Sequence, residues 1–134
     1  MISIVAKWSI LLGQEKPAMA ALKILARSVQ KEEPFVSMYT IHIPDFSATS
    51  FPTPSTSDVV FFSVFKNKAA FQKHLKGPVF QNWLAKYGSH FLMNNDNLFV
   101  VSELLARQAG FVRPEMVATM RVPREIKFAK GNSQ

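Results

Sequence analysis

Histidine and tyrosine are the side chains in this sequence best suited to proton chemistry. His74 follows Phe71 by three residues and precedes Leu75 in a segment of helical periodicity, so it lies at the margin of a core-facing stripe. Histidine titrates near neutrality, which makes His74 a candidate general base. The alternative is a structural role, in which a histidine at a helix boundary bonds to a backbone carbonyl.

Tyrosine and tryptophan supply the other candidates. Tyr39 either donates its hydroxyl to a negatively charged oxygen or is a buried tyrosine satisfied by the protein. Tyr39 and His42 have opposite parity on a predicted strand and therefore point to opposite faces, so at most one of them shares a pocket with His74. Trp8 and Trp83 could each wall a planar ligand or simply fill the core.

Composition and spacing exclude several other kinds of site. The chain has no cysteine, which rules out disulfides, thiolate metal sites and a thiol nucleophile. Its three histidines show no helical i, i+4 pairing that would bind a metal. The five glycines are scattered, without a phosphate loop or dinucleotide fingerprint, and no nucleophile elbow is present. We therefore expect no metal, nucleotide or flavin cofactor.

The hydrophobic periodicity alternates between strand and helix. Four segments have the composition of strands: residues 2–12, 35–43, 59–65 and 98–105. Two helical patterns begin at Glu15 and Asn67, and Gly77-Pro78 interrupts the second before it continues to Tyr87. The order β-α-β-β-α-β predicts an α+β, ferredoxin-like fold, with two helices on one face of an antiparallel sheet.

The opposite face of the predicted sheet needs a second partner. Residues 59–65 are an almost continuous apolar run, typical of a strand covered on both faces. A bare apolar sheet face usually marks association, so we expect a homodimer. Residues 44–57 form a long loop rich in Pro, Ser and Thr, which is either a lid or partner contact or a plain flexible connection.

The net charge of +7 is unevenly distributed. Residues 1–106 hold ten Lys/Arg against seven Asp/Glu, whereas residues 107–134 hold six against two. We therefore divide the chain into a domain at 1–106 and a basic extension at 107–134, whose apolar side chains we expect to pack on the partner subunit. No recognition helix accompanies the charge, so nucleic-acid binding is not expected. No apolar run is long enough to span a bilayer, and the lack of cysteine fits the cytoplasm.

Two segments resemble the antibiotic biosynthesis monooxygenase family. Residues 32–42, EEPFVSMYTIH, are similar to its "EPG-x-x-x-Y-x-x-H" stretch. Residues 61–84, FFSVFKNKAAFQKHLKGPVFQNWL, are similar to its "fYEvY-x-d-x-aAF-x-aHl-x-x-p-x-F" block. With the strand order, the resemblance extends to about residue 105, and AGFVRP at 109–114 is similar to longer relatives.

The resemblance implies a dimeric α/β barrel with a pocket between sheet and helices in each subunit. For several members it also implies oxygenation of quinol-type aromatic molecules without metal or flavin. Other members degrade haem, isomerise or merely bind small molecules, so fold transfers better than chemistry. The haem-degrading branch has an Asn, a Trp and a His where this chain has Trp8, Phe65 and Leu84, which argues against haem chemistry.

We therefore predict a cofactor-independent monooxygenase of a small aromatic or quinol-like substrate. His74 is the expected proton acceptor and Tyr39 the expected donor. The expected substrate contacts are Trp8, Ser63, Phe65 and Trp83. A non-catalytic dimer that binds a small hydrophobic molecule, or serves in stress response, is the main alternative, because Ser63 stands where the family often has Glu. An isomerase of small metabolites is the third possibility.

Overall fold

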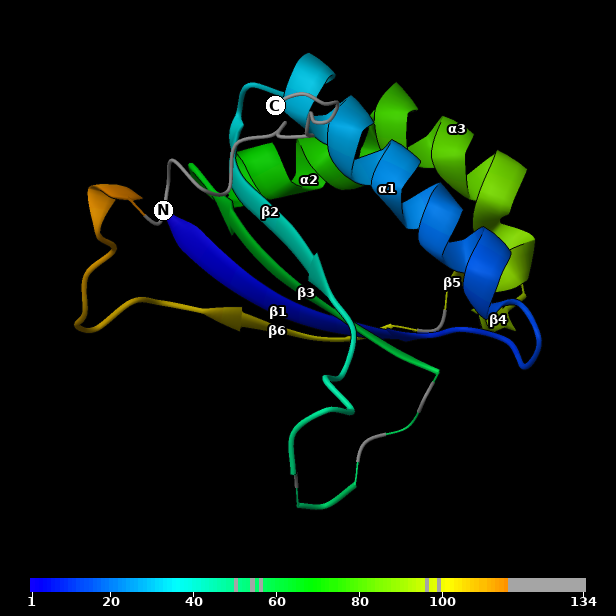
Figure 1. Ribbon diagram of the computed structural model, residues 1–134. Coiled ribbons are helices and arrows are strands. Elements are labelled where there is room, and N and C mark those ends of the chain that lie inside the picture. The colour runs from blue at the N-terminus through cyan, green and yellow to red at the C-terminus, as the bar shows by residue number, and fades with distance from the viewer. Residues whose placement is uncertain (50, 54, 56, 96, 99, 116–134) are drawn as a thin grey trace, which may run out of the picture.

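The computed structural model describes residues 1–49, 51–53, 55, 57–95, 97–98 and 100–115. The main sheet has four antiparallel strands, β1 (Ile2–Ser9), β2 (Val36–His42), β3 (Asp58–Phe65) and β6 (Val101–Leu105), in the order β2-β3-β1-β6 (Figure 1). The predicted α+β, ferredoxin-like fold is thereby confirmed. Residues 116–134, which include most of the apolar side chains expected on a partner subunit, lie outside the described residues.

Alternating burial in the two central strands explains which side of the sheet is packed. Ile4 and Trp8 of β1 are buried, as are Phe61 and Phe65 of β3, and all of them belong to the hydrophobic cores under the helices. Residues directly opposite one another in an antiparallel pair share a face. The register Ile4↔Ser63 and Ala6↔Phe61 therefore places Ser63 on the same side as the core.

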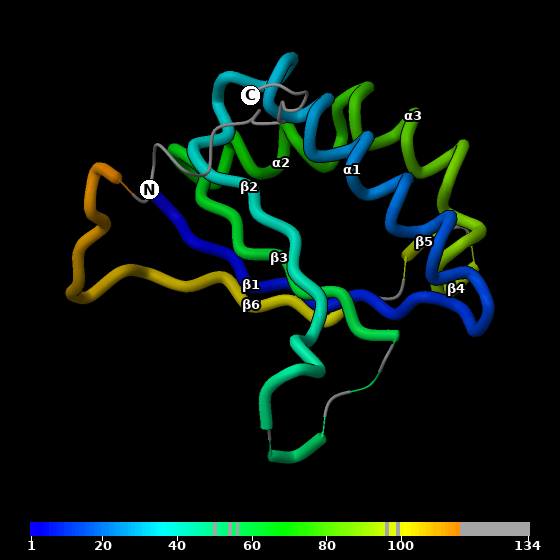
Figure 2. Tube along the Cα trace, in the orientation of Figure 1, coloured from blue at the N-terminus to red at the C-terminus, as the bar shows by residue number. Residues whose placement is uncertain are grey.

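Three helices, α1 (Glu15–Glu32), α2 (Lys68–Lys76) and α3 (Pro78–Tyr87), lie on one face of this sheet (Figure 2). Asn67 caps α2, because its side chain accepts a hydrogen bond from the Ala70 N–H at 2.8 Å. At Gly77 the helix is broken: a Cβ there would lie 2.7 Å from the Lys73 carbonyl oxygen. Pro78 begins α3 at a position that needs no N–H donor. A short 3₁₀ turn, η1 (Gly88–His90), follows.

The segment after the helices differs from the single strand expected at 98–105. Two-residue strands β4 (Met93–Asn94) and β5 (Asn97–Leu98) pair as a small hairpin, and only then does β6 join the main sheet beside β1. Asn95 adopts a positive φ of 59° at the turn, a conformation that asparagine tolerates better than most residues. Strands this short have too few residues to show a period of two.

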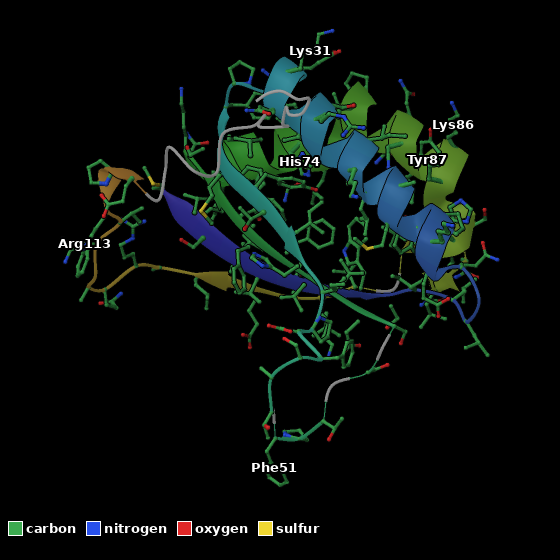
Figure 3. The ribbon with its side chains drawn as sticks, viewed as in Figure 1. Lys31, Phe51, His74, Lys86, Tyr87 and Arg113 are labelled. Carbon is green, nitrogen blue, oxygen red and sulfur yellow. The ribbon has the colours of Figure 1, made fainter. Side chains whose placement is uncertain are left out.

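The other face of the sheet has no cover among the described residues. Phe62 points to this side and is 42% exposed, so the described residues do not supply the cover on both faces that was expected for β3. The loop after β2 projects away from the helices, with Phe51 near its tip (Figure 3). Within the described part of the chain, no helix is both long and apolar enough to cross a membrane.

Candidate active site

His74 lies on α2, facing the sheet, and is only 3% exposed. Its Nδ1 is 2.6 Å from Oε1 of Glu33, which is 4% exposed. The expected alternative, a bond from His74 to a backbone carbonyl, is not what the structure has. An ionised carboxylate can only accept, so Nδ1 carries the hydrogen in this pair. The other ring nitrogen, Nε2, is then left for a group outside the pair.

Glu33 immediately follows α1 and is held there by its own backbone. Its N–H donates to the Val29 carbonyl at 2.9 Å, and its carbonyl accepts from the Val36 N–H at 3.0 Å. The first bond lies at the end of α1 and the second at the start of β2. The backbone of Glu33 is therefore fixed between this helix and this strand. Sequence reasoning did not single out Glu33, although it is the first residue of the EPF stretch on which the resemblance rests. A carboxylate at a helix C-terminus is disfavoured by the helix dipole, and this unusual placement is a signal that could have indicated Glu33.

Aromatic rings surround the His74 imidazole. The ring centroids of Tyr39, Phe65 and Phe80 lie 5.3, 5.4 and 5.6 Å from it, on β2, β3 and α3 respectively. Burial, and secondarily the charge of Glu33, raises the pKa of the Tyr39 phenol well above its ordinary value. Like a tyrosine of ordinary pKa, Tyr39 is protonated at neutral pH and can donate. Its hydroxyl has no hydrogen-bond partner among the described residues.

A cavity of about 340 Å³ opens between this cluster, the sheet and the β5 segment. Its polar lining residues are Tyr39, Ser63, His74, Gln81, Asn97 and Ser102. The apolar ones are Ile4, Ala6, Trp8, Phe61, Phe65, Phe71, Leu75, Phe80, Leu84, Leu98 and Val100. Rings and aliphatic chains thus form most of the wall, which suits a planar apolar molecule with a few polar substituents.

The structure brings together five of the six predicted site residues. Trp8, Tyr39, Ser63, Phe65 and His74 all line the cavity. Ser63 is 5% exposed, and its hydroxyl has no partner among the described residues. A buried hydroxyl without a partner is unfavourable unless something else satisfies it.

Trp83 is the sixth, and it lies behind the wall. Its Nε1 donates to the Ala21 carbonyl at 2.7 Å and so ties α3 to α1, while its ring lies 5.6 Å from that of Trp8. Trp83 therefore supports Trp8 from the core. It is absent from the cavity lining.

Sequence reasoning also missed three polar residues of the lining. Gln81 and Asn97 are exposed where the cavity meets solvent, and Ser102 faces the cavity from β6. Gln81 is held by a bond from its Nε2 to the Leu75 carbonyl at 2.7 Å. Parity along β6 could have indicated Ser102, but Gln81 and Asn97 depend on how α3 and the hairpin meet. Within the described ranges, no group of three or more His, Cys, Asp or Glu side chains is placed to hold a metal.

Comparison with known proteins identifies a family model that matches the chain and solved structures that share its fold. The family model described as antibiotic biosynthesis monooxygenase matches residues 1–86. Two solved structures whose names place them with these monooxygenases cover 81% of the chain: one from Caulobacter crescentus (16% identity, 90% of that chain, TM-score 0.65) and one from Nitrosomonas europaea (10%, 100%, 0.62). A third, from Chloroflexus aurantiacus, covers 83% of the chain and 96% of its own length at 14% identity, with a TM-score of 0.59. Among curated proteins, no sequence matches.

Proposed function

Because the chain belongs to the antibiotic biosynthesis monooxygenase family, we propose that it is a cofactor-independent monooxygenase of a small aromatic or quinol-like substrate. The observation that supports this best is that a buried histidine lines a largely aromatic cavity. His74 is bonded through Nδ1 to Glu33 and borders the cavity, so Nε2 is available to a ligand. A base inside an apolar pocket is what a phenol needs in order to ionise there.

The proposed reaction begins when Nε2 of His74 removes the proton from a phenolic hydroxyl. The anion gives one electron to O₂, and the two radicals combine in a new C–O bond at a ring carbon ortho or para to the hydroxyl that carries a hydrogen atom. That carbon then loses its hydrogen as a proton, the O–O bond breaks, and the second oxygen atom leaves as water. Phenol plus O₂ becomes quinone plus water, and the ring supplies all the electrons that reduce O₂.

Tyr39 and Ser63 are the proposed donors to the oxygen atoms of the substrate. Both border the cavity beside His74, and the Tyr39 phenol is protonated at neutral pH and so able to donate. A donor aimed at a developing oxyanion stabilises the ionised substrate in a site from which water is excluded. Trp8 and Phe65 are the proposed walls, since they face the cavity from β1 and β3.

An oxygen electrode and a panel of quinols and phenols test the proposal. The purified wild type should consume O₂. His74→Ala should lower the rate of uptake by a factor of about 10² to 10⁴, the usual contribution of a positioned base. His42→Ala is the matched control, because His42 is exposed on the other face of the sheet, where it bonds to Thr40. Tyr39→Phe separates the donor from the base, since it removes only a hydroxyl.

A non-catalytic binding protein is the second candidate, and Ser63 favours it. A carboxylate, common in the family at this position of β3, would give the cavity a second proton acceptor, and Ser63 gives none. Saturable binding of a quinol without O₂ uptake above the non-enzymatic background would support this candidate and exclude the monooxygenase. Uptake that His74→Ala leaves unchanged would keep the oxygenase and move its base elsewhere.

A homodimer is part of the proposal. The face of the sheet away from the helices holds Val5, Val60, Phe62, Val101 and Leu105, interspersed with polar side chains. Opposite residues share a face, so these side chains form one continuous surface over three strands. A second copy packed on this surface would remove the exposed part of Phe62 and its neighbours from water.

A further inference from the structure

We propose that Glu33 is a positioning residue for His74. Its carboxylate holds the neutral imidazole in the tautomer with hydrogen on Nδ1 and so presents an unprotonated Nε2 to the cavity. The catalytic consequence rests on the proposed function, whereas the tautomer can be measured in the resting protein.

The geometry of the pair supports this role. Nδ1 of His74 and Oε1 of Glu33 are 2.6 Å apart, and both side chains are almost completely buried. Among the described residues, His74 has no other hydrogen-bond partner, so the carboxylate alone selects the tautomer. The partner of one ring nitrogen decides which nitrogen is left free to react.

Both partners are held before any ligand arrives. The two backbone bonds of Glu33, to Val29 and from Val36, place its carboxylate at the junction of α1 and β2. The His74 ring is confined on its other sides by the rings of Tyr39, Phe65 and Phe80. Preorganisation of this kind means that neither side chain must be reordered when the proton moves.

Proton transfer gives the carboxylate a second effect. When Nε2 accepts the substrate proton, the imidazolium forms next to an anion that is already in place, so the new charge is paired between two buried side chains. With a neutral partner the same imidazolium would be a buried cation without a counter-charge, which is unfavourable. We therefore expect Glu33 to act on the chemical step more than on substrate binding.

Nitrogen NMR of His74 in the ligand-free full chain is the first measurement, made at a pH where the ring is neutral. The wild type should show hydrogen on Nδ1 and an unprotonated Nε2. Glu33→Gln keeps the size of the side chain but can donate as well as accept, so the ring should lose its preference for one tautomer. Glu32→Gln is the matched control, an exposed carboxylate one residue earlier, and it should leave the His74 signals unchanged.

Oxygen uptake is the second measurement, on the same proteins. Glu33→Gln should lower kcat by about ten- to a thousandfold with KM little changed, because the lost interaction is made mainly after proton transfer. Glu33→Asp retains the charge and should recover part of the rate that Glu33→Gln loses. It replaces the glutamine variant in both measurements if that variant does not fold.

The outcomes are separable from those of the proposed function. Hydrogen on Nε2 of His74 in the wild type, or the same tautomer and kcat in Glu33→Gln and Glu32→Gln, would overturn the positioning role. The expected tautomer in a wild type that turns over no substrate would count against the monooxygenase and leave the hold of Glu33 on His74 intact.

Discussion

Tyr39 and Ser63 lie directly opposite each other on β2 and β3, on the side of the sheet that faces the helices. Both hydroxyls border the cavity, and neither has a hydrogen-bond partner among the described residues. Two neighbouring donors without partners, beside the base, make this part of the cavity wall the natural place for a substrate oxygen. Because neither hydroxyl is bonded within the described part of the protein, substituting one of them should change ligand binding without lowering the stability of the free protein.

Ser63→Ala should weaken ligand binding while leaving the free protein equally or more stable. Ser63 is 5% exposed, and its hydroxyl has no partner among the described residues, so a ligand oxygen in the cavity would supply one. Its loss should raise the dissociation constant by about two- to tenfold, the worth of one neutral hydrogen bond. Removing a buried hydroxyl without a partner should leave the free energy of unfolding the same or raise it by up to about 1 kcal/mol. Calorimetric titration and urea unfolding measure the two quantities.

A large loss of stability in Ser63→Ala would mean that the serine is bonded within the protein. Unchanged affinity for every quinol that binds the wild type would remove Ser63 from the substrate contacts. Ser28→Ala is a suitable comparison, because that hydroxyl has a partner: it donates to the Ile24 carbonyl at 2.9 Å on α1, away from the cavity.

Residues close together in the chain were the easier part to predict. Alternation along β1 and the apolar stripe of α1 indicated the first two elements, and the same alternation placed Trp8 on the face of β1 that holds Ile4. Parity along β2 separated Tyr39 from His42 correctly. Each of these inferences depends on the local period of an element, which hydrophobic patterning reports directly.

The pairing of Glu33 with His74 could not be derived in this way. The two residues are 41 positions apart, and their contact depends on how the end of α1 meets α2. For Trp83 the same limit holds: helical periodicity places it inside, but only packing decides whether it faces the cavity or the Ala21 carbonyl. Tertiary contact, not pattern, distinguishes a site residue from a core residue at such positions.

Alkaline pH should unfold the protein before it ionises Tyr39. A phenol titrates at about 10 in an unfolded chain, and burial raises the pKa of Tyr39 above this value. Below pH 10 both states keep the proton, and this group makes no pH-dependent contribution. Above it, the unfolded state loses the proton and the folded state does not, so the free energy of unfolding falls by up to about 1.4 kcal/mol per pH unit from this group.

A Tyr87→Phe background makes the measurement specific, because the chain has two tyrosines. Ultraviolet difference spectra should show no phenolate from Tyr39 until circular dichroism reports unfolding. Adding Tyr39→Phe should reduce the alkaline slope of stability, and the difference between the two proteins removes the contribution of lysines. Phenolate absorbance near the ordinary pKa in a folded protein would show that the hydroxyl is open to solvent.

Phe62→Lys should weaken the proposed homodimer by about tenfold or more, the effect of losing one central interface residue. Phe62 is at the middle of the uncovered sheet face, opposite Val5 on β1 and Thr40 on β2, and 42% of it is exposed. A lysine there would place a charge at the centre of the contact in place of a large apolar ring, and burying that charge is unfavourable. Sedimentation equilibrium over a range of concentrations measures the change.

Leu12→Lys is the control, since Leu12 is 93% exposed in the turn that precedes α1, outside this face. A wild type that stays monomeric at micromolar concentration would refute the dimer, and equal dimer affinity in the two lysine variants would place its interface on another surface.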